Sequence, residues 1–68
     1  MDSELLELDA LLEYLVKHNA EHAEEIMELA VRAKGLGRTP VYEDLVHGVD
    51  LLNSSNERLK AALAGLRA

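Results

Sequence analysis

The sequence contains no cysteine, tryptophan or phenylalanine, and it has only one proline and two tyrosines. Without cysteine the chain can form neither a disulfide nor a thiolate metal site. A chain poor in aromatic residues and rich in Leu, Ala and Glu favours helices over a β-sandwich or barrel. No apolar run approaches the roughly 20 residues of a membrane span. The start, Met1-Asp2-Ser3-Glu4, is acidic where a signal peptide is basic. We therefore predict a cytoplasmic protein with no membrane partner.

Positive charge is also scarce, since the formal net charge is −6. An acidic surface repels phosphate backbones, which makes nucleic acid an unsuitable partner. An RNA-binding hairpin dimer of the plasmid copy-control kind would need a basic helix face. The first half of the chain offers only Lys17, Arg32 and Lys34 against nine acidic residues at positions 2 to 28. We predict that the protein does not bind nucleic acid.

The distribution of glycine and proline predicts two helices. Residues 3–34 contain neither residue type, which allows about 48 Å of helix at 1.5 Å per residue. Gly35-Leu36-Gly37 then provides a helix stop. Thr39 is suited to cap a second helix over residues 40–66, and Pro40 fits its first position. A short connection between two long helices predicts one all-α domain, residues 1–68, folded as an antiparallel hairpin.

Apolar residues recur at alternating spacings of three and four in both segments, which is typical of helices that pack along a seam. The spacing sets Asn19 beside Asn56, with His22 in the same seam. Further apolar residues widen each stripe, and a 68-residue hairpin buries little by itself. A homodimeric four-helix bundle is therefore predicted. The first ladder is Leu5, Leu8, Leu12, Leu15, Asn19, His22, Ile26, Leu29 and Ala33; the second is Tyr42, Leu45, Val49, Leu52, Asn56, Leu59, Leu63 and Leu66.

The most reactive group of side chains lies in the middle of the first helix. His18 and His22 are four residues apart and share a helix face, which Glu25 continues. Two imidazoles and a carboxylate suit nickel, zinc or copper, so these three residues are the predicted metal ligands. Asn19 and Asn56 are predicted to orient the two rings from a second shell.

Two other interpretations of this polar layer remain open. In the first, the layer only sets the register of a dimerisation or protein-interaction module. In the second, histidines in a seam charge near pH 6 and push the helices apart. Catalysis has no support in the sequence: it has no cysteine nucleophile and no phosphate-binding glycine loop, and His18 to His22 does not match the zinc-protease motif. We predict that the protein is not an enzyme.

Two segments carry a resemblance to a known family. Leu11-Leu12-Glu13-Tyr14-Leu15-Val16-Lys17-His18-Asn19-Ala20-Glu21-His22 is followed downstream by Leu52-Asn53-Ser54-Ser55-Asn56-Glu57-Arg58-Leu59. Together they resemble small helical-hairpin domains of unassigned function with a His-Asn-x-x-His centre. Such domains occur alone or beside nickel-binding accessory domains of the carbon monoxide dehydrogenase maturation type. Family members often carry Trp where Leu15 stands. The resemblance implies a shared central cluster of His18, Asn19, His22 and Asn56, favours metal binding and implies no enzyme activity.

Overall fold

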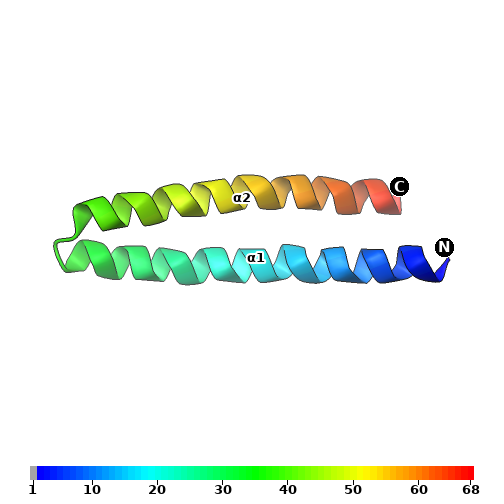
Figure 1. Cartoon of the computed structure of the whole chain (residues 1–68), viewed down its shortest axis with the longest axis horizontal. Coiled ribbons are helices and arrows are strands. Elements are labelled where there is room, and N and C mark those ends of the chain that lie inside the picture. The colour runs from blue at the N-terminus through cyan, green and yellow to red at the C-terminus, as the bar shows by residue number, and fades with distance from the viewer. Residues whose placement is uncertain (1) are drawn as a thin grey trace.

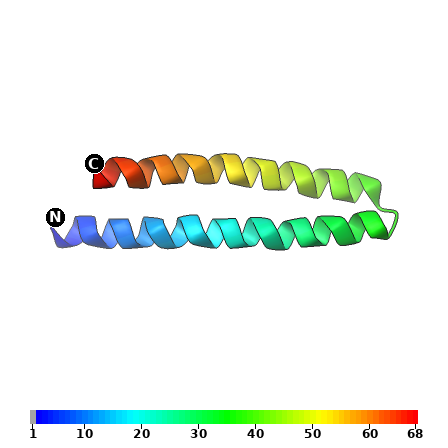
Figure 2. The same cartoon turned by 180° about the vertical axis from the view of Figure 1, so that it is seen from behind.

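The computed structural model describes residues 2–68 as two antiparallel helices (Figure 1). Helix α1 spans Ser3–Gly35 and helix α2 spans Thr39–Arg67. The hairpin measures 53 × 14 × 12 Å, with both termini at one end and the turn at the other (Figure 2). The predicted all-α hairpin is confirmed, and the predicted helix bounds differ by one residue at three of the four ends. Within the described residues, neither helix carries an apolar segment that would cross a membrane.

Local hydrogen bonds explain where the helices begin and end. The Asp2 carboxylate accepts the Leu5 N–H at 2.9 Å and so caps α1. Gly37, with φ 77°, turns the chain after α1. Thr39 was predicted to cap α2, but this prediction is wrong: Arg38 holds the cap position without a side-chain hydrogen bond. The reason is that the Arg38 carbonyl already accepts the Tyr42 N–H at 3.0 Å, so the helix begins one residue earlier.

The seam between the helices is narrow and made largely of small side chains. Its best-buried apolar residues are Ala23, Ala30, Val49 and Leu63. Helix α2 contacts α1 through the ladder predicted for it, Tyr42 to Leu66, all buried or half-buried. Helix α1 contacts α2 through the following buried or half-buried residues: Leu12, Val16, Asn19, Ala23, Ile26, Ala30 and Ala33.

The α1 seam corrects the ladder predicted from the sequence. Leu15 and Leu29 were placed in the seam but are 43% and 50% exposed, and the His22 side chain is 49% exposed. From Leu12 to Ala33 the two ladders share every second member and otherwise differ by one position, and the predicted members Leu5 and Leu8 are outside the seam, 39% and 46% exposed. Ala23 and Ala30 bring the two backbones close together, and this close packing turns the larger side chains onto the flank. His22 is therefore a surface residue beside the seam.

The open end of the hairpin is held by an ion pair across the helices. The Arg67 guanidinium donates two hydrogen bonds to the Asp9 carboxylate at 2.8 and 2.9 Å, and its Nη2 lies 3.5 Å from Glu13. Such a forked pair fixes geometry as well as charge. The hydrogen bond from Arg67 lowers the pKa of Asp9 below its ordinary value of 3.8. At the other end, Lys34 lies 5.0 Å above the ring of Tyr42.

We expect the Asp9–Arg67 pair to contribute stability that acid removes. A lowered folded-state pKa means that the contribution is present above pH 3.8 and is lost as the pH falls through the folded-state value. Asp9→Asn should therefore lower the urea midpoint at pH 7. The difference in urea midpoint between the variant and the original protein should be smaller at pH 3. The measurement is urea unfolding followed by circular dichroism. Glu57→Gln, which breaks only the exposed pair with Lys60, is the matched control. An equal gap at both pH values would contradict the assignment.

Candidate functional site

Halfway along the hairpin, two asparagine amides join the helices. Asn19 Nδ2 donates to Asn56 Oδ1 at 3.2 Å, and Asn56 Nδ2 donates to the Val16 carbonyl at 3.0 Å. Asn56 is only 4% exposed. The predicted pairing of Asn19 with Asn56 is confirmed. Because a buried amide without a partner is costly, these bonds select one register of α1 against α2.

The two histidines of α1 meet on the surface beside this layer. His18 Nε2 and His22 Nε2 lie 2.8 Å apart, with the ring centroids 4.2 Å apart and the planes at 79°. The Tyr14 ring stacks on His18 with centroids 5.2 Å apart and so restrains that ring. Three aromatic rings, one helical turn apart, therefore form a continuous row on one face of α1.

Glu25 contacts the other side of the His22 ring. Its Oε2 lies 3.3 Å from His22 Nδ1, whereas the Nε2 atom faces His18. The tautomer follows from the partners: when Nδ1–H donates to the carboxylate, the lone pair of His22 Nε2 points at His18. This is the arrangement by which a carboxylate orients a metal-binding histidine. The structure thus brings all three predicted ligands together, with Glu25 behind His22 and away from the His18 side.

Compared with the predicted cluster, the asparagines and histidines occupy two adjacent faces of α1. The amides of Asn19 and Asn56 bond each other and Val16 inside the seam, while His18 and His22 bond each other outside it. No group of three or more His, Cys, Asp or Glu side chains within residues 2–68 is arranged to hold a metal ion. A single hairpin therefore presents two converging imidazole nitrogens and no complete coordination sphere.

The histidines belong to a second heptad stripe on α1, which sequence reasoning merged with the seam. Its leucines are well exposed: Leu8 46%, Leu11 54%, Leu15 43% and Leu29 50%. The signal that could have separated this stripe from the seam is the parallel run of Val16, Ala23 and Ala30, one position later. We call the following residues the second stripe: Leu8, Leu11, Leu15, His18, His22, Glu25 and Leu29.

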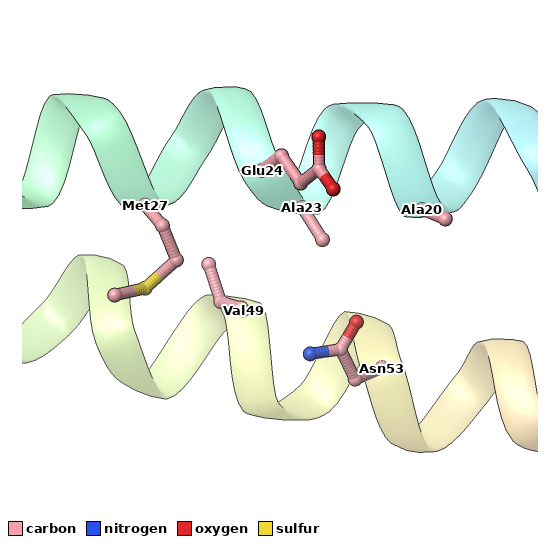
Figure 3. Close-up of a pocket in the computed structure, with 6 residues that line it drawn as sticks. All are labelled: Ala20, Ala23, Glu24, Met27, Val49 and Asn53. Atoms are coloured by element: carbon pink, nitrogen blue, oxygen red, sulfur yellow. The ribbon is translucent and has the colours of Figure 1, made fainter.

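An open groove lies on the opposite flank of the seam (Figure 3). The short side chains of Ala20 and Ala23 leave it unfilled, while Met27 and Asn53 lie at its sides. Apart from the seam residue Ala23, the groove residues of α1 each follow a seam residue directly, whereas second-stripe residues precede one, so the groove lies on the flank away from the second stripe. The residues that line it are Ala20, Ala23, Glu24, Met27, Val49 and Asn53.

Comparison with known proteins gives one match. Residues 8–66 match the model of a domain of unknown function, DUF8180. The chain belongs to this family. The matched range contains the seam, the paired asparagines and the entire second stripe. No curated protein and no solved structure matches the chain.

We expect that replacing one asparagine of the pair lowers the free energy of unfolding, whereas replacing both by apolar residues changes it little. Asn56→Ala leaves the Asn19 amide without its partner and should destabilise the hairpin by about 1–3 kcal/mol. Asn19→Leu with Asn56→Leu replaces both amides by apolar groups of similar shape and should restore most of that loss. Urea unfolding at constant protein concentration measures both. If the double variant loses as much stability as Asn19→Leu and Asn56→Leu lose when measured singly and added, the pair is not coupled.

Proposed function

We propose that the protein is a self-association module in which two hairpins pack, second stripe to second stripe, as a four-helix bundle. The observation that supports this most directly is the second stripe itself: seven residues at heptad spacing that include four exposed leucines and one carboxylate, Glu25. A stripe of this kind is covered by another helix when a hairpin becomes a bundle. The proposal keeps the homodimeric partner and cytoplasmic location predicted from the sequence, and its role is binding rather than catalysis.

The surface area supports a second copy as the partner. The hairpin exposes 5159 Å². A folded monomer of 7.5 kDa is expected to expose about 4,250 Å². The excess of about 900 Å² is close to the roughly 800 Å² that each partner contributes to a stable interface of standard size. The hairpin therefore leaves uncovered about as much surface as one copy of itself would bury.

Helix α2 presents a matching row on the same side of the hairpin. Asn53, which directly follows the seam residue Leu52, lies on the groove side, so residues that directly precede seam residues lie on the other side. Gly48 is one of these, and a Cβ at this position would meet nothing within 4 Å. Exposed small residues alternate here with half-buried leucines that also belong to the seam with α1. We call the following residues the α2 row: Leu45, Gly48, Leu52, Ser55, Leu59, Ala62 and Leu66.

The leucine positions Leu8, Leu15 and Leu29 of the second stripe and all the leucines of the α2 row fit the symmetry that a two-fold dimer requires, whereas Leu11, His18 and Glu25 have no symmetric member in their stripe. In the second stripe, Leu8 and Leu29 are equally far from a centre at His18–Asn19, and so are Leu15 and His22. The α2 row is centred at Ser55–Asn56 in the same way. The hydrogen bond from Asn19 to Asn56 sets the two centres at the same height. One two-fold axis across the hairpin at this level would therefore pair each row with its own copy, antiparallel, as an isologous interface demands.

The dimer is tested by its mass and by a charge placed in the second stripe. We expect the original protein to have twice the 7.5 kDa of one chain and Leu15→Lys to have the mass of one chain, measured by light scattering at equal concentration. Val31→Lys is the matched control, because Val31 is also an exposed apolar residue of α1 (61%) but lies off the second stripe. Val31→Lys should keep the doubled mass. A single-chain mass for the original protein would overturn the proposal.

The antiparallel register is tested by cysteine crosslinking, which the absence of cysteine makes unambiguous. An equimolar mixture of Leu8→Cys and Leu29→Cys should form a mixed disulfide under mild oxidation, because the proposed axis sets these positions opposite each other. Each variant alone should crosslink poorly, since its two copies of the cysteine would lie at opposite ends of the bundle. Mass spectrometry of the oxidised mixture identifies the product. Efficient crosslinking of Leu8→Cys with itself would contradict the antiparallel arrangement.

A further inference from the structure

The proposed two-fold axis passes through the second stripe at the level of the histidines. We propose that His18 and His22 of one hairpin and the same two residues of its copy form a single four-imidazole site for a divalent transition-metal ion. This inference rests on the dimer proposed above, because one hairpin supplies only two ligands. The metal class is that which imidazole nitrogens favour: zinc, nickel or copper.

The spacing of the two nitrogens already suits one ion. Zinc–nitrogen bonds are about 2.0–2.1 Å long, so two nitrogens on the same ion lie roughly 2.9 Å apart at a right angle and roughly 3.3 Å apart in a tetrahedron. The observed separation of His18 Nε2 and His22 Nε2 is 2.8 Å. An ion would displace the proton that these nitrogens share to solvent; the two nitrogens would separate by a few tenths of an ångström, and both rings would turn so that their lone pairs converge on the ion.

The side chains around the pair restrain it in the geometry that a metal needs. Glu25 at His22 Nδ1 favours the tautomer with a free lone pair on Nε2. Tyr14 stacks on His18 and limits the rotation of that ring. The net charge of −6 per chain concentrates cations near the surface. Glu25 would act as an orienting residue, because it contacts the ring nitrogen that faces away from His18.

The symmetry of the second stripe supplies the remaining two ligands. His18 lies within one residue of the centre at which the stripe would cross its own copy, and His22 lies one turn beyond it. The two imidazole pairs would then converge on the axis from opposite sides, with His18 of each copy near the centre and His22 of each copy level with Leu15 of the other. A tetrahedral ion takes four ligands, which equals the number the two hairpins provide.

The test is native mass spectrometry with isothermal titration of zinc chloride and, separately, nickel chloride. We expect one ion for every two chains. His18→Ala with His22→Ala should remain a dimer and lose the ion, and His47→Ala, which removes an exposed histidine of α2, should keep it. Leu15→Lys should separate the copies and weaken metal binding at least tenfold. Glu25→Gln should weaken affinity about 10–100-fold while the ratio of one ion to two chains is kept.

The outcomes separate this inference from the dimer itself. A dimer that takes up no ion at micromolar metal would overturn the metal site and leave the self-association standing. One ion bound to each single chain, unaffected by Leu15→Lys, would overturn the shared site. A single-chain mass both with and without metal would overturn both proposals. Metal uptake that survives His18→Ala with His22→Ala would assign the ion elsewhere and overturn the histidine site.

Discussion

The hydrogen bond between Asn19 and Asn56 is the constraint on which the rest of the hairpin depends. Leucine and alanine seams slide past one another at small cost, since one apolar contact replaces another. A buried amide tolerates one position only, where its donor and acceptor are both satisfied. With Asn56 bonded to both Asn19 and the Val16 carbonyl, α1 and α2 are aligned along their full length. The Asp9–Arg67 pair at the open end agrees with the same alignment.

Small side chains in the seam have a second effect, because they decide which face of α1 is left outside. Ala23 and Ala30 allow the backbones to approach, and the bulkier Leu15, His22 and Leu29 then lie on the flank, about half exposed. The larger apolar side chains of α1, which could pack against another helix, are thereby exposed on one face. The choice of seam thus decides both which apolar side chains stabilise the hairpin and which remain exposed, since burying one stripe exposes the other.

Much of this architecture can be predicted from the sequence, and the features that could not be predicted have physical explanations. Glycine and proline placement gives both helices within one residue, and spacing alone pairs Asn19 with Asn56. The α1 seam was assigned wrongly because two ladders overlap in one helix, and hydrophobicity favours leucine where close packing favours alanine. The contact of Glu25 with Nδ1 rather than Nε2 of His22, and the stacking of Tyr14, depend on side-chain rotamers that spacing does not encode.

Both termini of the hairpin lie at the end opposite the turn, and the hairpin is 53 Å long (Figure 1). An antiparallel two-fold dimer places the termini of one copy beside the turn of the other. Anything joined to the two chains would then be carried at opposite ends of a stiff rod about as long as the hairpin. In that geometry the register between the two copies would determine how far apart the attached groups are held, whereas the two asparagines set only the register of α1 against α2.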